Sequence, residues 1–456
     1  YSCRAGPETE HHRRFSLNRP VLLLLALAIA PRVADAQRVV LVSVDGLRPD
    51  FYLHPGEHGV ELPALRAMVA DGVYAEEVES VYPTLTYSPH TSIVTGALPA
   101  RHGIVNDTLF DGKGRFDDWY WRADAIRGKT LWDVAPGTTA AILWPATVGA
   151  DIDLNFPDFW IPGDSRPWGD AMAGVATPQL LKEIGPVPAK PFDEERLEDL
   201  LFRSAELVLE THRPSLLLLH PIDTDAQQHR HGREQQDVAS AFERTDRALG
   251  RLRARIAALG LADETLFAVT GDHGFFQTHT SIHLNARLRE AGLLEVGRDG
   301  AVSSYRALAW PSGGSCFLML RDRKDNRSRK EVETLVEEML AGPLGGAMSL
   351  VPRSELDRLG AVPEALFALD AGEGYAFGKN LEGPLLSPSH DSGYHGSLPH
   401  HPKMKTGFLM AGPRVRRGLA VPRMRLIDIA PTIAFWAGWD LPEADGLALR
   451  ELFEGR

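Results

Sequence analysis

Cysteine is almost missing from this chain, which has 456 residues and two cysteines, Cys3 and Cys316. Disulfide bonds therefore cannot be the scaffold of the fold. The sequence also lacks internal repeats, low-complexity tracts and the many long apolar segments of a polytopic membrane protein. Because 44% of the residues are hydrophobic and 24% are charged, the composition is that of a soluble globular protein with a core of its own.

Positive charge is also scarce. The 49 Lys and Arg residues are outnumbered by 61 Asp and Glu residues, which gives a formal net charge of −12. Polymeric nucleic acid is held mainly by Lys and Arg contacts to phosphate, so we expect no such partner. The acidic balance does not exclude a small phosphorylated substrate, because bound metal ions can supply positive charge locally.

Residues 1–36 have the features of an export signal. Arg13, Arg14 and Arg19 precede an apolar run at 21–30, and residues 34–36 show the small-x-small pattern of a cleavage site. The run is too short to span a bilayer, which needs about 20 apolar residues in a helix. We predict cleavage after Ala36 and an exported protein, periplasmic or secreted, without an integral membrane domain; an uncleaved membrane anchor is the alternative.

The rest of the chain alternates between two kinds of apolar pattern. Short continuous runs, as expected for strands buried on both faces of a sheet, lie at 38–44, 139–143, 216–220, 266–270 and 407–410. Apolar residues spaced three and four apart, as in amphipathic helices, lie at 63–71, 194–211 and 235–259. Strands that alternate with helices predict parallel βαβ units and an α/β fold.

Length alone would suggest about three domains. The candidate site residues, however, are spread from position 45 to position 395 and can meet only inside one domain. We therefore predict a single catalytic domain over 37–456, with insertions near 145–195 and 285–390.

Acidic and histidine side chains follow several of the predicted strands, at the carboxyl ends where functional groups gather in such sheets. Taken singly, each has an ordinary explanation as a helix cap, a turn, a surface pair or a loop histidine. Three strand ends of this kind, with a fourth loop that lies before the strand at 407–410, together indicate a metal site, because carboxylate and imidazole are ligands of zinc and similar divalent ions. The residues are Asp45, Asp223 or Asp225, His229, Asp272, His273 and His395.

A further segment, 81–96, places a hydroxyl just before a helix start marked by proline. Helix N-terminal N–H groups favour negative charge, so Thr86 is well placed to contact an anion. It either caps the helix or acts as a nucleophile. Threonine is a weak nucleophile until its pKa is lowered, and metal coordination does this. The catalytic interpretation of Thr86 therefore depends on the metal cluster.

Eight segments together resemble the nucleotide pyrophosphatase/phosphodiesterase family of the alkaline phosphatase superfamily, over about residues 38–449. This resemblance implies an α/β fold, an alkaline-phosphatase-like α/β/α sandwich with a mostly parallel central sheet and inserted loop or cap segments. The segments are VDGLRPDF (44–51), PTLTYSPHTSIVTGALPARHGI (83–104), WP (144–145), FPD (156–158), DAQQHRHG (225–232), TGDHGF (270–275), GYHG (393–396) and IDIAPTIA (427–434).

The resemblance also implies two Zn²⁺ per chain. Thr86 would attack phosphorus to give a phosphothreonine, and water would then release the second product. The metals would neutralise charge on the phosphoryl oxygens, so an acidic protein could act on an anionic substrate. One zinc site would consist of Asp45, Thr86, Asp272 and His273, and the other of Asp225, His229 and His395.

The family pattern fits less well around the phosphoryl oxygens and the substrate. The family usually has an Asn 21 residues after the threonine, and this chain has Asp107 there, with Asn106 beside it. We assign the oxyanion region to these two residues. Tyr87 and Trp160 lie where family members place aromatic rings that stack on a base, although a structural role for either ring is equally open.

The prediction is a metal-dependent hydrolase that cleaves phosphodiester or pyrophosphate bonds of nucleotides or related small diesters. The runner-up is a phosphomonoesterase or phosphonate hydrolase with the same metals. A catalytically silent binding protein on this fold is the alternative from another class. A sulfatase is disfavoured, since the sequence lacks the Cys-x-Pro-x-Arg segment that supplies its nucleophile. The sequence does not indicate an oligomeric state.

Overall fold

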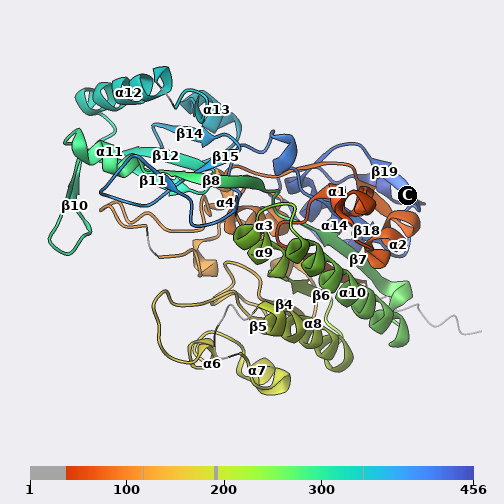
Figure 1. Ribbon diagram of the computed structural model, residues 1–456. Helices are drawn as coiled ribbons and strands as arrows, with labels where there is room; N and C mark the ends of the chain where they lie inside the picture. Colours follow the sequence, from red (N-terminus) through yellow and green to blue (C-terminus); the bar gives the residue numbers. More distant parts are fainter. Residues whose placement is uncertain (1–36, 117, 189, 191–193, 343, 456) are drawn as a thin grey trace, which may run out of the picture. The chain divides into compact units, whose positions relative to one another are not determined.

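An eight-stranded sheet lies at the centre of the described chain (Figure 1). The computed structural model describes residues 37–455 except 117, 189, 191–193 and 343, so the predicted leader and its cleavage site lie outside the described residues. The strand order is β19 (Leu419–Val421), β2 (Val73–Ala75), β18 (Phe408–Ala411), β7 (Thr265–Thr270), β1 (Arg38–Ser43), β6 (Leu216–Leu219), β4 (Thr139–Ile142) and β5 (Leu154–Phe156).

Most neighbours in this sheet are parallel. Strands β7, β1, β6, β4 and β5 all run in one direction, so the predicted α/β fold with a mostly parallel sheet is confirmed. Strand β18 is an exception within this mostly parallel sheet, because it runs antiparallel to β7, with Phe408 opposite Thr270. A strand parallel to β7 would have to begin at the opposite edge of the sheet, so the chain would need a long crossover connection to reach it. Strand β18 instead starts at the edge where β7 ends.

The central strand β1 shows why its sequence is continuously apolar. Val40 and Val42 belong to a core packed against one set of helices, whereas Val39 and Leu41 belong to a second core on the other face. Each face is therefore covered, as in a doubly wound sheet. The first core includes α2 (Pro63–Asp71), α8 (Glu194–Thr211) and α10 (Gln236–Ala258), and the second includes α3 (Tyr87–Thr95) and α14 (Ile429–Ala437).

A smaller antiparallel sheet follows in the chain. Its strand order is β11 (Ala307–Ser312), β12 (Ser315–Leu320), β14 (Phe367–Ala371) and β13 (Met348–Val351). Helices α11 (Leu284–Glu290) and α12 (Asn326–Ala341) contribute to its apolar core. Strand β8 (Phe276–Ile282) pairs with β15 (Gly374–Phe377), β16 (Leu386–Pro388) and β17 (Gly393–Tyr394).

The remaining elements are short apart from α9, which carries part of the candidate site. None of the described helices is long and apolar enough to cross a membrane. The bounds are α1 (Pro49–Leu53), β3 (Val78–Glu79), α4 (Pro99–His102), α5 (Leu131–Val134), α6 (Trp168–Met172), α7 (Pro178–Ile184), α9 (Asp223–His231), β9 (Leu294–Val296), β10 (Val302–Tyr305), α13 (Arg353–Arg358) and β20 (Met424–Arg425).

Candidate active site

Three adjacent parallel strands bring the first candidate ligands together. Asp45 follows β1, Asp272 follows β7, and Asp225 lies in the first turn of α9, which follows β6. Because β6 and β7 flank β1 in parallel register, their carboxyl ends meet at one edge of the sheet. His229 lies one turn after Asp225 on α9, so the two side chains face the same way.

His395 reaches this edge by another route. It follows β17, which pairs with β8, and β8 itself follows the loop that holds Asp272 and His273. The His395 and His273 rings are stacked, with centroids 3.6 Å apart and planes at 7°. The pairing of β17 with β8 therefore brings a residue more than a hundred positions later into the same site.

Chain neighbours of Thr86 on both sides contact these groups. Two residues earlier, the carbonyl oxygen of Thr84 is 3.0 Å from Nδ1 of His395. One turn later on α3, Nδ1 of His90 is 3.5 Å from a carboxylate oxygen of Asp272. The Thr86 side chain makes no capping hydrogen bond at the start of α3, so the capping role considered for it is not observed.

The candidate ligands form two contiguous groups. In the first, Nε2 of His229 and Nε2 of His395 are 3.1 Å apart, and both nitrogens lie within 3.7 Å of Oδ1 of Asp225. In the second, Nε2 of His273 is 3.2 Å from Asp45 and 3.3 Å from Asp272. Asp225 also lies within ligand distance of Asp45 and His273, so the two groups adjoin.

The three histidines are oriented by backbone carbonyls. Nδ1 of His229 lies 3.0 Å from the oxygen of Gly393, and Nδ1 of His273 lies 3.2 Å from that of Gly274. His395 has the contact to Thr84 already described. A carbonyl oxygen only accepts, so Nδ1 carries the hydrogen and Nε2 keeps a lone pair in each neutral ring. Metal-binding histidines are typically oriented in this way.

The unpaired atoms at the centre fit a metal ion. The two Nε2 lone pairs of His229 and His395 face each other, which is unfavourable without a cation between them. Several buried atoms have no hydrogen-bond partner among the described residues. They are Asp45 Oδ1, Asp225 Oδ1, Asp272 Oδ2 and His273 Nε2. The carboxylate and imidazole donor set is the one expected for zinc.

Burial and neighbouring carboxylates shift the pKa values of the same groups. Burial raises the pKa of Asp45 to about 8, and burial also raises the pKa of Asp225 and Asp272 well above their ordinary values. Repulsion between the carboxylates acts in the same direction, as Asp45 adds to the rise for both of the others. Burial lowers the pKa values of His273 and His395 well below the usual value of an imidazole. The site therefore disfavours its own ligands in charged form until a cation is present.

The two residues of the predicted oxyanion region have different positions. Oδ1 of Asp107 accepts a hydrogen bond of 2.8 Å from the backbone N–H of Tyr87, next to Thr86. Asn106 instead donates its side-chain amide to the hydroxyl of Ser312 and accepts from the backbone of Asp107. Burial raises the pKa of Asp107 to about 6. Asp107 is therefore the residue of this pair that contacts the start of α3.

The two predicted substrate aromatics belong to one larger cluster. Tyr87 is buried, and its hydroxyl donates to a carboxylate oxygen of Asp158 at 3.0 Å. The Trp160 ring lies 5.1 Å from Trp119 and 5.5 Å from Trp121, and Trp119 lies 5.4 Å from Tyr87. Sequence reasoning missed Trp119 and Trp121, although three aromatic residues in a row at 119–121 were a usable signal.

Two buried histidines were also missed. His90 and His220 form a third group of possible metal ligands with Asp272. His90 lies inside the segment that contains Thr86, and His220 directly follows β6. Their positions beside a predicted nucleophile and at a strand end could have marked them as members of the site.

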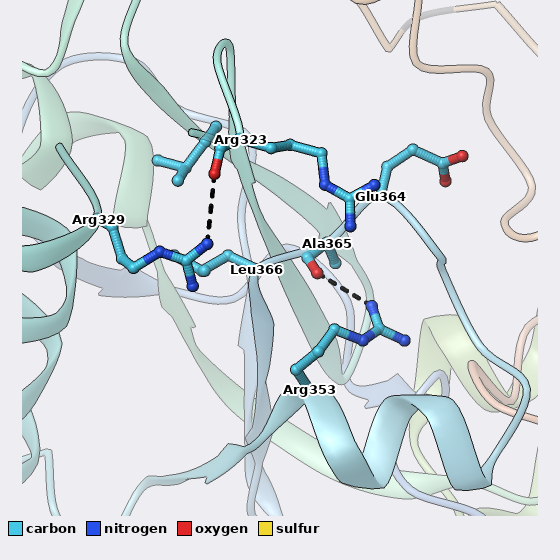
Figure 2. Close-up of a pocket in the computed structure, with 7 residues that line it drawn as sticks. Arg323, Arg329, Arg353, Glu364, Ala365 and Leu366 are labelled. Atoms are coloured by element: carbon cyan, nitrogen blue, oxygen red, sulfur yellow. Dashed lines mark hydrogen bonds between the residues drawn. The ribbon is translucent and has the colours of Figure 1, made fainter. Parts of the chain in front are cut away.

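A small hollow in the later part of the chain is built differently (Figure 2). Arg329 donates to the carbonyl of Arg323, and Arg353 donates to that of Ala365, so these guanidinium groups hold backbone segments together. Its volume of about 70 Å³ is well below the roughly 300–1,000 Å³ of typical ligand pockets. Its lining residues include none of the predicted site residues.

Comparison with known proteins identifies one family. The family model described as "Type I phosphodiesterase / nucleotide pyrophosphatase" matches residues 39–397. Ectonucleotide pyrophosphatase/phosphodiesterase family member 1 of Mus musculus is 27% identical over 286 residues, which are 58% of this chain and 27% of the relative. Bis(5'-adenosyl)-triphosphatase ENPP4 of Bos taurus is 27% identical over 256 residues, which are 54% of this chain and 49% of the relative. The matched part thus spans about a quarter to a half of these relatives.

Solved structures show the same fold. Human ectonucleotide pyrophosphatase / phosphodiesterase 5 superposes with a TM-score of 0.65 at 20% identity, covering 92% of this chain and all of that one. An inactive threonine-to-alanine variant of the murine protein in complex with AMP gives a TM-score of 0.64 at 20% identity, covering 91% of this chain and all of that one.

Proposed function

The chain belongs to the type I phosphodiesterase / nucleotide pyrophosphatase family, and from this premise we propose that it hydrolyses phosphodiester or pyrophosphate bonds of nucleotides or related small diesters in a metal-dependent reaction. The observation that carries the proposal is the position of Thr86. Its hydroxyl is not used as a helix cap. The residue lies two positions after Thr84, which contacts His395, and four before His90, which contacts Asp272. The names of the relatives and the AMP complex of the murine protein support a nucleotide substrate.

Two Zn²⁺ per chain are the proposed cofactor. One would be held by Asp225, His229 and His395. The other would be held by Asp45, Asp272 and His273, together with the Thr86 hydroxyl. When bound, zinc would lower the pKa of a hydroxyl or water and neutralise charge on phosphoryl oxygens. The orphaned buried atoms of these residues support the assignment.

The protein's own groups define the reaction sequence. Oγ of Thr86 attacks phosphorus, and the bond from phosphorus to the leaving alcohol or nucleoside phosphate breaks, which leaves a phosphothreonine. Water then attacks the phosphothreonine and restores the hydroxyl. The N–H groups at the start of α3 favour the negative charge of the phosphoryl group. We assign Trp119 and Trp160, the partly exposed members of the aromatic cluster, to stacking on the base of a nucleotide, with the buried rings of Tyr87 and Trp121 packed against Trp119.

The proposed protein is an exported enzyme. Residues 1–36 are the leader, cleaved after Ala36, and residues 37–456 are a single catalytic domain with insertions near 145–195 and 285–390. The names of the relatives, which describe ectonucleotide enzymes, support export to the periplasm or secretion. The acidic net charge supports a small phosphorylated substrate rather than polymeric nucleic acid.

The test compares p-nitrophenyl-thymidine monophosphate, a diester, with p-nitrophenyl phosphate, a monoester. We expect diester preference, loss of activity with a chelator and recovery with Zn²⁺. The variant Thr86→Ala should lose at least ~10³-fold in kcat, because the nucleophile is removed. Thr91→Ala is the matched control, since Thr91 is a buried threonine of the same helix whose hydroxyl donates to the carbonyl of Tyr87. Full activity in Thr86→Ala would refute the covalent mechanism, and monoester preference would favour a phosphomonoesterase.

A further inference from the structure

His90 and His220 have no part in the proposed reaction, yet both are buried next to it. His90 lies one turn after Thr86 on α3, and His220 directly follows β6. Both side chains are at most 1% exposed, and their ring centroids are 4.1 Å apart. Two imidazoles packed this closely in the interior need partners for four ring nitrogens.

Backbone carbonyls account for only one nitrogen of each ring. Nδ1 of His90 lies 2.8 Å from the carbonyl oxygen of Thr86, and Nδ1 of His220 lies 3.0 Å from that of Leu143. This is the arrangement found in His229, His273 and His395. It leaves a lone pair on Nε2 of each neutral ring. Nε2 of His90 is buried without a hydrogen-bond partner among the described residues.

Carboxylate oxygens face the same two rings. Oδ2 of Asp45 lies 3.1 Å from Nε2 of His220, while Oδ1 of Asp45 faces His273 at 3.2 Å. Oδ1 of Asp272 accepts from the backbone N–H groups of Gly46 and His273. Its Oδ2 is buried without a hydrogen bond and lies 3.5 Å from Nδ1 of His90. Two atoms of this group, Nε2 of His90 and Oδ2 of Asp272, are thus buried without a hydrogen-bond partner among the described residues.

We propose that His90, His220 and Asp272 hold a third divalent cation, with Oδ2 of Asp45 as a fourth ligand. One ligand atom from each of the first three residues lies within 4.8 Å of the others. Two imidazoles with carboxylate suit a borderline-soft ion such as Zn²⁺. The proposal rests on the proposed function, because Asp45 and Asp272 would also be ligands of the adjoining zinc site.

Burial assigns this ion a structural role. All four ligand residues are at most 3% exposed, and a closed site without access for water or substrate is typical of structural rather than catalytic metals. The ion would connect the ends of β1, β6 and β7 to α3 and so fix the helix that carries Thr86. It would also offset charge among five acidic side chains, Asp45, Asp107, Asp158, Asp225 and Asp272.

The test is the metal content of the full chain, freed of metal with a chelator, dialysed against Zn²⁺ and measured by mass spectrometry. Zinc-edge anomalous diffraction from crystals of the same protein locates each ion. We expect three ions per chain, with one in contact with His90 and His220. His220→Gln and His90→Gln should each bind two. The matched control is His102→Gln, since His102 is equally buried but pairs with the hydroxyl of Ser92, and it should keep three.

Two zinc ions in the wild-type protein, with none beside His220, would overturn the proposal. A proton on one of the two imidazoles would then take the place of the third ion. Three ions retained in both His90→Gln and His220→Gln would overturn it as well. If both variants fail to fold, the anomalous peaks of the wild-type protein decide the question alone. Failure of the proposed function has a different signature, which is no diester hydrolysis or no ion beside Asp225, His229 and His395.

Discussion

At the scale of single residues, five buried or half-buried histidines share one arrangement. In each, Nδ1 lies 2.8–3.2 Å from a backbone carbonyl oxygen, so Nε2 is left for another partner. A histidine inside an ordinary core would satisfy both nitrogens with protein groups. Burial alone does not mark a proposed ligand, because His102 is fully buried and has its Nε2 paired with the hydroxyl of Ser92, whereas Nε2 of the equally buried His220 faces the carboxylate of Asp45.

Asp107 gives a prediction at this scale. Its carboxylate accepts the N–H of Tyr87 beside the nucleophile, so it adds negative charge where a phosphoryl group would be held. A monoester dianion is repelled more than a diester monoanion. Asp107→Asn keeps the shape and removes the charge, and we expect it to raise kcat/KM for p-nitrophenyl phosphate at least ~10-fold more than for the diester.

The control for this prediction is Asp111→Asn. Asp111 is an exposed carboxylate four positions later, and its substitution should leave the ratio of the two kcat/KM values unchanged. Equal effects of Asp107→Asn on both substrates would show that the carboxylate does not select by substrate charge.

At the scale of elements, the ends of strands decide which residues meet. Parallel strands β1, β6 and β7 end at one edge, which brings Asp45, the start of α9 and Asp272 together. The antiparallel strand β18 starts at that same edge, since Phe408 pairs with Thr270. The segment before β18 can therefore supply His395, whereas the other carboxylate and imidazole ligands that we propose follow strands of the central sheet.

The packing of α8 against α10 gives the second prediction. Glu198 of α8 is buried, accepts from the hydroxyl of Thr245 on α10, and has its other oxygen unpaired. Burial raises the pKa of Glu198 from 4.5 to about 7. The unfolded chain therefore releases this proton at lower pH than the folded protein, and stability falls between about pH 4.5 and 7.

Glu198→Gln cannot ionise, so this loss should disappear. We expect the variant to match the wild-type protein near pH 4.5 and to be more stable by up to about 3 kcal/mol at pH 8, as measured by denaturant unfolding. Asp199→Asn on the same helix is the control, because that side chain is 56% exposed. A stability difference that is the same at both pH values would contradict the assignment to ionisation of Glu198.

At the scale of the whole molecule, the buried carboxyl groups of the proposed metal site oppose the stability of the folded chain as long as no cation is bound. Burial raises the pKa of Asp45, Asp225 and Asp272 together, so the folded protein without metal holds protons that bound cations would displace. A ligand that binds only the folded state stabilises it by about 2.7 kcal/mol at a hundredfold excess over Kd.

The third prediction follows from this linkage. Zn²⁺ added to chelator-treated protein should raise Tm, and the rise should be larger at pH 8 than at pH 6, because at the lower pH each ion must displace protons from carboxyl groups. Differential scanning calorimetry measures both values. Asp225→Asn, which lacks one proposed ligand, should show a smaller rise. A Tm that does not respond to zinc at either pH would contradict a metal-filled site.

The sequence alone determined the α/β class and the residue types of the site, because both depend on local patterns. Continuous apolar runs such as 38–44 indicate strands buried on both faces, and Asp or His directly after such runs indicates a functional edge. The family resemblance added the expected order of the ligands and the nucleophile Thr86. Local patterns could not show the direction of β18, since an apolar run has the same composition in either orientation.

Only the tertiary structure decided which of these residues touch. It separated Asp107 from Asn106, which are adjacent in sequence, by giving one a contact with Tyr87 and the other a contact with Ser312. It also joined His90, His220 and Asp272, which are far apart in the chain. The physical reason is that such contacts depend on the pairing of distant strands and on which ring nitrogen a backbone carbonyl occupies, and neither is encoded in a local window of sequence.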